Sequence, residues 1–555
     1  MNEKVFLLLL GCVTGLVTSL PLSAQIQYNL LGVNKDAPKS EDSEIPKGIF
    51  GKIIQANKDS KTPMYGGDIL VQNERSAMNC PSCLWPKSDS GSVLVPYTID
   101  SRYSPSDLNN IVLAMAEFET LTCVRFVLRT TEDSYLNITP DNGCYSSLGR
   151  TGGSQTVSLD EGCVYMEIIQ HELEHALGFH HEHMRSDRDN YVDINYQYIP
   201  EGRWGNFGKV DTNNLGSPYD YGSVMHYDAY AFSNTSNKPT IVPKPDPNVT
   251  IGLAVGLSVL DVTKINRLYQ CSVCSTLLNN ETGIFTSKNY PSAYPNNVDW
   301  VWLIRVPSGQ ASLNFNRFKI QSTPNCKSDY MRIYDGPSKS SPVLLDKMCG
   351  SKNIPPIIAS TTQMLVQFVS DGAVAGVGFQ ATYSSVQCGG TFFNSQGNFT
   401  SPGYPDHYNP DINCNFTITA PVGYKVKQDT SMTFPNYWTL KCQTSKMLWK
   451  TDTLQSECIT PFKFTSVHQG LPEIIETKFF YDTIALTISD FHLESSGLCE
   501  YDYVKLFMDG KQTGPFCGDR TIPVFNSKGN SMVLEFHSDD STVAKGFQVS
   551  YTFFK

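Results

Sequence analysis

One stretch of eleven residues, from His171 to His181, constrains the chain more than any other part of its sequence. It reads HELEHALGFHH, and in a helix His171 and His175 are four residues apart, so both imidazoles project from one face. Gly178 tolerates positive φ and lets the chain turn sharply, which brings His181 back as a third ligand from a new direction. Three imidazoles with one open position form a catalytic zinc site, whereas structural zinc sites are closed by four protein ligands.

Glu172 lies beside the same face of the predicted helix, where its carboxylate reaches a metal-bound water without being a ligand. A bare HExxH pattern recurs by chance on ordinary helices, and alone it would leave the two interpretations about equal. The glycine and the third histidine make the pattern far more specific. The sequence therefore predicts that His171, His175 and His181 bind Zn²⁺ and that Glu172 is the general base.

The segment HELEHALGFHHEHMR, which ends at Arg185, resembles the zinc signature of the astacin family of metzincin endopeptidases. A second segment, SVMHY at residues 223–227, resembles the Met-turn of that family. A Met-His-Tyr sequence alone is more often part of a core, but its place about 45 residues after the zinc helix favours the functional interpretation. The resemblance implies that Met225 is the hydrophobic floor beneath the metal. It also implies that Tyr227 is a displaceable zinc ligand that stabilises the transition state.

The composition indicates a secreted protein of several domains. A length of 555 residues implies roughly three or four domains, and sixteen cysteines indicate disulfides and an oxidising compartment. The net charge of −11 and the lack of basic runs argue against a nucleic-acid partner. The apolar run after Lys4 and the Leu22-Ser23-Ala24 stretch predict a signal peptide at 1–24, and no later run is long enough to span a membrane. Six N-x-S/T sequons suit that route, at Asn137, Asn234, Asn248, Asn280, Asn398 and Asn415.

Residues 25–75 are polar and contain one short motif, Tyr65-Gly66-Gly67-Asp68. A flexible linker with a turn at the glycines is one interpretation. Beside an astacin-like domain, the motif resembles the FxGD motif of the family's propeptides, with Tyr65 in place of phenylalanine. The resemblance implies that Asp68 occupies the water position on zinc and keeps the enzyme latent, because a carboxylate oxygen competes directly with the catalytic water.

Arg75 and Ser76 form a cleavage site suited to a trypsin-like activating protease. In active astacins the new N-terminus lies near the glutamate that follows the third histidine, which is Glu182 in this chain. We therefore predict that cleavage frees an ammonium group at Ser76 that pairs with Glu182 and orders the site.

The segment from Ala77 to Tyr97 resembles one subgroup of the family, the hatching enzymes that digest egg envelopes. Cys80 and Cys83 form a CxxC pair within it. A redox motif and a zinc site are the alternatives, but no thioredoxin-like βαβ unit and no second CxxC follow. A local disulfide is the favoured interpretation.

The resemblance places an α+β metzincin catalytic domain at residues 76–271, with a twisted sheet and the active-site helix above a less regular lower half. Ser104 and Pro105 suit the N-cap and first turn of a helix, and residues 258–261 predict a capping box that begins a last helix. The apolar residues of the first helix repeat at helical spacing and predict one buried stripe of Leu108, Ile111, Val112, Met115 and Phe118. The family resemblance implies the disulfides Cys123–Cys271 and Cys144–Cys163.

An internal repeat fills the rest of the chain. GIFTSKNYPSAYPNN at 283–297 recurs as GNFTSPGYPDHYNPD at 397–411, and SDYMRIYDG at 328–336 recurs as YDYVKLFMDG at 501–510. Short β-rich runs between turn residues predict β-sandwiches. The repeats resemble CUB domains, which implies two all-β jelly-roll modules at about 274–385 and 388–555. Disulfides are expected at Cys326, Cys349, Cys388, Cys414, Cys499 and Cys517.

Comparison of the two copies reveals a missing cysteine in the first one. Cys388 is followed by Cys414 in the second copy, but Trp300 stands at the equivalent distance after Cys274 in the first. We therefore expect Cys274 to lack its partner, a loss that costs about 2–5 kcal/mol. Without Cys12 of the signal peptide the cysteine count is odd, so we also expect one thiol to be free or bonded to another chain.

The second copy also contains a long extra segment. The stretch from Cys414 to Cys499 corresponds to the much shorter one from Trp300 to Cys326 in the first copy. The excess lies at about 425–483, lacks the character of the repeat, and exceeds ordinary β-sandwich connections. A retained intron or gene-model error is the favoured explanation, and a genuine surface insertion in which Cys442 and Cys458 pair is the alternative.

Some CUB modules bind calcium through one glutamate and two aspartates. The matching residues of the second module are Glu494, Asp502 and Asp539, which suit a hard cation, whereas surface acids without an ion are the alternative. In the first module the matching residues are Gln321, Asp329 and Asp371, and the neutral glutamine weakens the case for calcium there.

These features together predict a secreted zinc endopeptidase made as a zymogen, whose partner is an extracellular protein, most specifically an egg-envelope glycoprotein. A matrix-processing astacin of the procollagen-cleaving type is one alternative, although the chain has no EGF-like cysteine block. The other alternative is a CUB adhesion protein with an inactive protease domain, which the intact zinc ligands and Glu172 argue against. The oligomeric state does not follow from the sequence.

Overall fold

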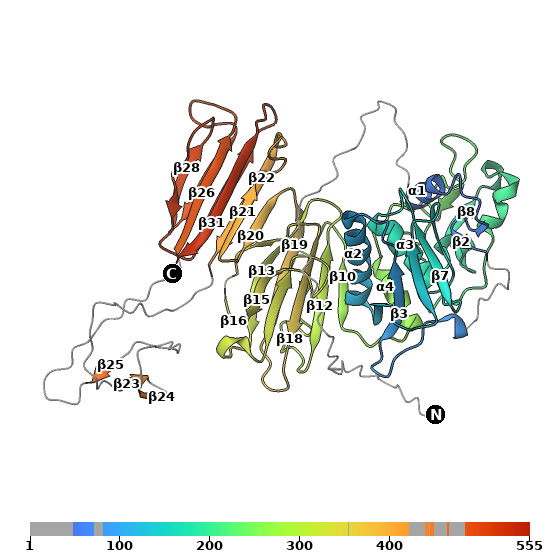
Figure 1. The fold of residues 1–555 in the computed structure, drawn as a ribbon, viewed down its shortest axis with the longest axis horizontal. Coiled ribbons are helices and arrows are strands. Elements are labelled where there is room, and N and C mark those ends of the chain that lie inside the picture. Colours follow the sequence, from blue (N-terminus) through green and yellow to red (C-terminus); the bar gives the residue numbers. More distant parts are fainter. Residues whose placement is uncertain are drawn as a thin grey trace. The chain divides into compact units, whose positions relative to one another are not determined.

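The computed structural model describes residues 48–71, 81–352, 354–420, 439–442, 445–448, 463–465 and 483–554. They form one α+β domain followed by two all-β modules, as the sequence predicted (Figure 1). The chain divides into two compact units, and the α+β domain shares one unit with most of the first β-module. The predicted signal peptide, the Arg75–Ser76 bond and Cys80 lie outside the described residues. Among the described helices, none has both the length and the apolar character needed to cross a membrane.

A seven-stranded sheet forms the upper half of the α+β domain, in the order β1-β2-β6-β7-β5-β3-β4. β3 runs parallel to β4 and β5, and β5 runs parallel to β7, whereas β6 is antiparallel to β7. β1 and β2 come from the predicted propeptide, and Ile69 of β2 pairs with Ser146 of β6. The predicted propeptide therefore extends the sheet. The strands are β1 (Met64–Tyr65), β2 (Ile69–Leu70), β3 (Val93–Ile99), β4 (Val124–Leu128), β5 (Tyr135–Thr139), β6 (Cys144–Ser146) and β7 (Ser154–Leu159).

Helix α2 (Pro105–Leu121) begins as predicted, with Ser104 as its N-cap and Pro105 in its first turn. The structure adds a capping box between Ser104 and Asp107. The prediction of its buried stripe is wrong at Val112, whose side chain is 49% exposed. The buried face of α2 includes Ile111, Met115 and Phe118. It continues on the side away from Val112, where it includes Glu117. The reason is that α2 packs against the first β-module as well as against the sheet, so its buried arc is wider and rotated away from Val112.

The other helices position the site. α3 (Met166–Ala176) packs between α2 and the strands β6 and β7, and α1 (Ile49–Ala56) belongs to the predicted propeptide. α4 (Val259–Leu268) has the predicted capping box. The lower half is irregular and contains β8 (Val192–Ile194), β9 (Ile241–Pro243) and the 3₁₀ helices Glu182–Met184, Arg188–Asn190, Tyr196–Tyr198 and Glu201–Phe207. Further 3₁₀ helices are Pro81–Cys83, which precedes β3, and Pro324–Cys326 in the first β-module.

The two β-modules repeat one sheet pattern. The first has a sheet in the order β10-β12-β18-β14-β15, and the second has the equivalent order β20-β22-β30-β27-β28. The first two strands are parallel in both modules. The second sheets are β11-β19-β13-β16, with β17 beside β13, and β21-β31-β26-β29. The predicted pair of related β-sandwiches is therefore confirmed.

The strands of the first module are β10 (Ser275–Leu278), β11 (Thr282–Thr286), β12 (Asp299–Arg305), β13 (Gln310–Ile320), β14 (Tyr330–Tyr334), β15 (Val343–Met348), β16 (Gly350–Ser351), β17 (Ile357–Ile358), β18 (Gln363–Val369) and β19 (Gly378–Val386). Those of the second are β20 (Gly389–Phe392), β21 (Gln396–Thr400), β22 (Ile412–Thr419), β26 (Thr483–His492), β27 (Tyr503–Met508), β28 (Lys511–Phe516), β29 (Phe525–Asn526), β30 (Ser531–Ser538) and β31 (Gly546–Phe554). Within the extra 425–483 segment, β23 (Thr439–Cys442), β24 (Ser445–Leu448) and β25 (Lys463–Thr465) pair only with one another.

Disulfides join the cysteines that the resemblance paired in the α+β domain, Cys123 with Cys271 and Cys144 with Cys163. The modules contain Cys326–Cys349, Cys388–Cys414 and Cys499–Cys517. The expectation of an unpaired Cys274 is wrong, because Cys274 and Cys83 are both disulfide-bonded and no cysteine of the described residues is free. Comparison of the two copies could show only that the partner expected within the first module is missing. It gave no information about a partner elsewhere in the chain. A pairing of Cys442 with Cys458 concerns side chains outside the described set.

Candidate active site

Helix α3 and the turn after it bring the three predicted metal ligands together. His171 and His175 lie one turn apart on α3, and Gly178 adopts a φ of 103°, which lets the chain reverse before His181. The Nε2 atoms of His171 and His181 lie 3.0 and 3.1 Å from Oδ2 of Asp68, and Nε2 of His175 lies 3.6 Å from Oδ1. All four side chains are at most 1% exposed.

The hydrogen bonds around these rings fit a metal ion at their centre. Nδ1 of His175 lies 2.7 Å from the carbonyl oxygen of Phe179, so it carries the proton and leaves Nε2 as a lone pair. Burial lowers the pKa of His175 and lowers that of His181 to about 4, so both rings are neutral. Nε2 of His175 and Oδ1 of Asp68 face each other, and neither has a hydrogen-bond partner in the described chain.

Two facing lone pairs need a cation between them. Ligands about 2.0–2.1 Å from a tetrahedral zinc ion lie about 3.3 Å from one another, close to the observed separations. His171 has the same arrangement as His175, because its Nδ1 lies 2.8 Å from the carbonyl oxygen of Val224. The donor set and its spacing therefore fit Zn²⁺ held by His171, His175, His181 and Asp68.

Glu172 follows the first histidine and is completely buried. Neither of its carboxylate oxygens has a hydrogen-bond partner among the described residues. Burial raises its pKa well above the usual value, and the nearby Asp68 carboxylate adds to the effect. An increased affinity for a proton is what a general base requires, provided that the charged form is accessible once the site is open to substrate.

The predicted Met-turn lies beneath the histidines and is fixed by α4. Oδ1 of Asp261 accepts from the Ser223 hydroxyl at 2.6 Å, and Oδ2 accepts from the Val224 amide at 2.9 Å. The buried Met225 accepts through its carbonyl oxygen from the Glu182 amide at 2.9 Å. The N-terminal cap of α4 therefore holds both the helix and the turn under the metal site. The sequence indicated Asp261 only as a helix cap.

The predicted propeptide contacts the site through more residues than Asp68. The hydroxyl of Tyr227 donates to the carbonyl oxygen of Gly66. Gly66 and Gly67 have φ values of 65° and 91°, and a Cβ at Gly67 would lie 2.9 Å from the Phe50 ring, so both positions require glycine. Tyr65, the substituted residue of the motif, is partly buried.

Phe50 of α1 was not singled out from the sequence, because it belongs to no motif. Its ring stacks on Tyr227 with centroids 3.5 Å apart, and it is completely buried. The amide of Gly51 donates to Oδ2 of Asp228 at 3.0 Å, which fixes the start of α1 beside Tyr227. The apolar spacing in residues 49–54 was the only feature of the sequence that could have indicated that Phe50 is buried.

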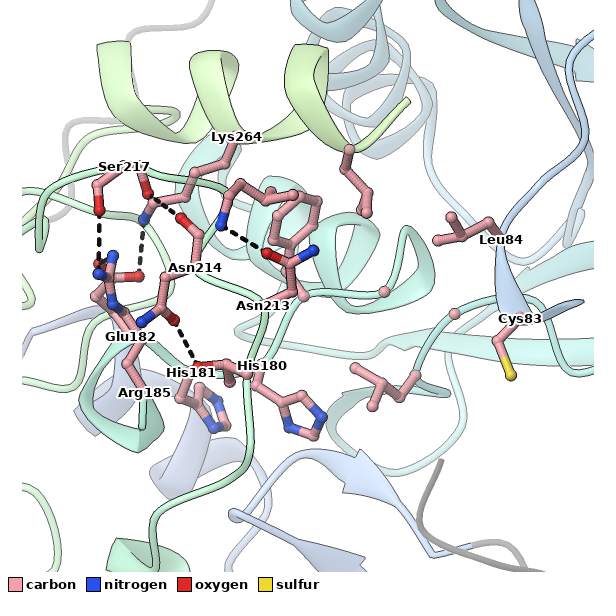
Figure 2. A pocket seen from close by; sticks show the side chains of 17 residues that line it. Cys83, Leu84, His180, His181, Glu182, Arg185, Asn213, Asn214, Ser217 and Lys264 are labelled. Atoms are coloured by element: carbon pink, nitrogen blue, oxygen red, sulfur yellow. Dashed lines mark hydrogen bonds and ion pairs between the residues drawn. The ribbon is translucent and has the colours of Figure 1, made fainter. Parts of the chain in front are cut away.

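Glu182 borders a pocket of about 310 Å³ beside the third histidine (Figure 2). Its carboxylate accepts from Lys264 at 2.7 Å, from Arg185 at 3.1 Å and from the Asp220 amide at 2.8 Å. All three charged side chains are nearly buried. Ser76 lies outside the described residues, so its pairing with Glu182 stays a prediction, and it would have to join or displace Lys264.

Comparison with known proteins agrees with this geometry. The model of the Astacin peptidase family matches residues 79–270, and the CUB domain model matches residues 274–383, 388–447 and 475–551. The chain is 44% identical to embryonic protein UVS.2 of Xenopus laevis over 573 residues, which cover 100% of both chains. The chain belongs to the astacin family.

Two further relatives share the astacin domain. An astacin-like metalloendopeptidase of Gallus gallus is 50% identical over 63% of this chain and 86% of its own. High choriolytic enzyme 2 of Oryzias latipes is 48% identical over 40% of this chain and 80% of its own. This astacin is accordingly a zinc metalloendopeptidase with two CUB modules, the second of which is interrupted at about 448–474 in the family match.

The predicted calcium ligands of the second CUB module also lie together. One ligand atom from each of Glu494, Asp502 and Asp539 lies within 4.8 Å of the others. Asp502 is buried, accepts from the Tyr408 hydroxyl, and accepts from the Asp539 amide at 2.9 Å. Oε2 of Glu494 is buried without a hydrogen-bond partner in the described chain.

The first CUB module has the same framework with a different charge. Asp329 accepts from the Tyr294 hydroxyl and, at 2.8 Å, from the Asp371 amide. Gln321 stands in the place of Glu494, so this site has one negative charge fewer.

Proposed function

We propose that this astacin is a secreted zinc endopeptidase, made as a zymogen, that hydrolyses egg-envelope glycoproteins. The observation that carries the proposal is the convergence of His171, His175 and His181 on one carboxylate beside the unpartnered Glu172. The disulfides and N-x-S/T sequons support secretion. The name of the medaka relative, a choriolytic enzyme, and that of the Xenopus relative, an embryonic protein, support the substrate.

The proposed chemistry is hydrolysis of a peptide bond by an activated water. Zn²⁺, when bound, supplies a Lewis acid that polarises the scissile carbonyl and lowers the pKa of water towards about 7. Glu172 removes the proton of the attacking water and passes it to the leaving amine. The Tyr227 hydroxyl, once free of Gly66, donates a hydrogen bond to the oxyanion of the tetrahedral intermediate.

The same residues account for the proposed latency. Asp68 takes the position opposite the three histidines that the water needs, and Gly66 engages the hydroxyl of Tyr227. Cleavage after Arg75 by a trypsin-like protease would release residues 25–75 and free both groups. Met225 remains beneath the site as its apolar floor.

The experiment that tests this function is activation of the secreted full-length protein by trypsin. We expect cleavage of isolated egg envelope only after trypsin treatment, loss of that activity with a zinc chelator, and recovery with added Zn²⁺. Gelatin and procollagen serve as competing substrates. Preferential processing of procollagen would favour the matrix-processing alternative, and a correctly cleaved, zinc-loaded protein that hydrolyses none of them would contradict the endopeptidase mechanism.

We also propose that the second CUB module binds Ca²⁺ through Glu494, Asp502 and Asp539. About 2 mM Ca²⁺ should raise the Tm of this module by about 5 °C, because extracellular modules bind calcium with Kd values of about 10⁻⁴–10⁻³ M. Asp502→Asn should abolish the rise. The matched control is Asp329→Asn in the first module, where Gln321 weakens the site, and this variant should keep the calcium-dependent rise. Scanning calorimetry with and without Ca²⁺ measures both, and an unchanged response in Asp502→Asn would refute the site.

A further inference from the structure

Helix α2 of the astacin domain has a second buried face that the sheet does not cover. Ala114, Glu117 and Leu121 lie on this face, and each is 0% exposed. A glutamate is almost never fully buried unless it is paired. The partner of Glu117 therefore shows which part of the chain packs on this face of the helix.

The partners of Glu117 come from the first CUB module. Arg305 at the end of β12 donates from Nη1 to Oε2 of Glu117 at 2.6 Å, and the Gln363 amide donates to Oε1. Arg305 and Gln363 are directly paired across the β12–β18 ladder, so one edge of the module presents both donors together. The side chain of Arg305 is 4% exposed, which makes this a buried ion pair.

The same network reaches the zinc helix. Oε2 of Glu117 also accepts from Nε2 of Gln170 at 2.9 Å, and Gln170 directly precedes the ligand His171 on α3. Oε1 of Gln170 accepts from the Leu257 amide at 2.8 Å, while Arg305 donates to the Leu257 carbonyl oxygen. Leu257 leads into the α4 cap that holds the Met-turn. Arg305 is thus two hydrogen bonds from the zinc helix and one from the segment that supports the turn.

The backbone at Gly256 leaves room for the side chains of Arg305 and Gln170. Gly256 has a φ of 144°, and a Cβ at this position would lie 2.7 Å from Nη1 of Arg305 and 2.7 Å from Oε1 of Gln170. Any larger residue would clash with the network. The Ser275 hydroxyl donates to the Leu121 carbonyl oxygen at 2.8 Å, which adds a contact at the end of α2.

Apolar packing continues the interface. One hydrophobic cluster contains the core of the astacin domain together with five buried residues of the first CUB module. These are Leu277, Val301, Leu303, Tyr334 and Leu365. A continuous core across two modules is typical of an obligate interface, whereas independently moving domains meet through more polar surfaces.

We propose that the first CUB module is an integral part of the catalytic unit, and that Arg305 is a positioning residue for the zinc helix. Arg305 touches neither the metal site nor the substrate. It acts by neutralising Glu117, which holds Gln170 and therefore the start of the HExxH turn in place. Removal of Arg305 leaves a buried carboxylate without its charge partner, the situation in which a buried pair is most costly to break.

The test is Arg305→Met in the full-length protein, which keeps the volume of the side chain and removes its charge. We expect the Tm of the transition that includes the astacin domain to fall by about 10 °C. We also expect zinc to leave for a chelator about tenfold faster, because groups that orient ligands affect metal affinity by about 10–100-fold. After activation, kcat should fall with little change in KM. The Tm and the zinc release need no substrate, so they test this inference even if the proposed substrate is wrong.

The matched control is Arg332→Met in the same module, whose partner Asp346 is 67% exposed. This variant should keep the wild-type Tm and zinc-release rate, since exposed ion pairs contribute little. A second variant, Arg305→Met with Glu117→Gln, removes both charges and should recover most of the lost Tm. If Arg305→Met behaves like the control, the module is not integral to the unit. A lower Tm with unchanged zinc release would overturn the positioning role.

Discussion

Replacing Glu172 with glutamine is expected to lower kcat of the activated enzyme by about 10³–10⁴-fold, with KM and zinc content nearly unchanged. The amide keeps the size of the side chain but cannot take the proton of the attacking water. The residue is buried beside the three histidines and has no other hydrogen-bond partner in the described structure, so it has no visible structural role to lose. Steady-state kinetics on a peptide, together with metal analysis of the purified variant, measures the effect.

Glu174 provides the matched control on the same helix. It is also buried, burial raises its pKa well above the usual value, and glutamine is close to it in size. Glu174→Gln should therefore keep nearly full activity. Retention of more than about a tenth of the activity in Glu172→Gln would exclude Glu172 as the base.

Tyr227→Phe should lose about 10²-fold in kcat, because it removes one hydrogen bond to the oxyanion.

Replacing Asp68 with alanine should make the uncleaved protein about 10- to 100-fold more active than the uncleaved wild type, if the proposed latency holds. The reason is that a charged hydrogen-bonding group contributes about 1.5–3 kcal/mol, and each 1.4 kcal/mol is tenfold in an equilibrium constant. Full activity is not expected before cleavage, because Phe50 and the β1–β2 strands still cover the site. The measurement is peptide hydrolysis by the intact protein in the presence of a trypsin inhibitor.

Asp59→Ala is the control for this prediction, because Asp59 belongs to the same segment and is exposed. It should remain as latent as the wild type. If Asp68→Ala is equally latent until Arg75 is cleaved, then the strands and Phe50 block the site and the carboxylate does not.

The grouping of the three histidines beside Glu172 and the two repeats could be predicted because each belongs to a short pattern of local spacing. The place of Asp68 was implied only by the resemblance of residues 65–68 to a propeptide motif. The i, i+4 geometry of a helix and the turn at Gly178 need no knowledge of the rest of the fold. The two β-sandwiches were likewise indicated by short repeated segments.

Other features depend on segments that are distant in the sequence and could not be predicted in this way. Phe50 lies in the predicted propeptide, yet its ring stacks on Tyr227 of the predicted Met-turn segment. The burial of Glu117 goes with its ion pair to Arg305, which lies in another module. The state of Cys274 was wrongly predicted, because a repeat indicates a partner only inside its own copy.

The two short strands that the predicted propeptide adds to the sheet have a consequence for the direction of the proposed activation. While Arg75 is intact, the tether holds α1, β1 and β2 at an effective concentration of about millimolar beside the surfaces they cover. If cleavage occurs there as we propose, Ile49, Phe50 and Ile53 would leave as part of a separate peptide, which would be diluted into the surrounding medium. Dilution would then oppose rebinding, so each molecule would be activated once and would not return to the proposed latent state.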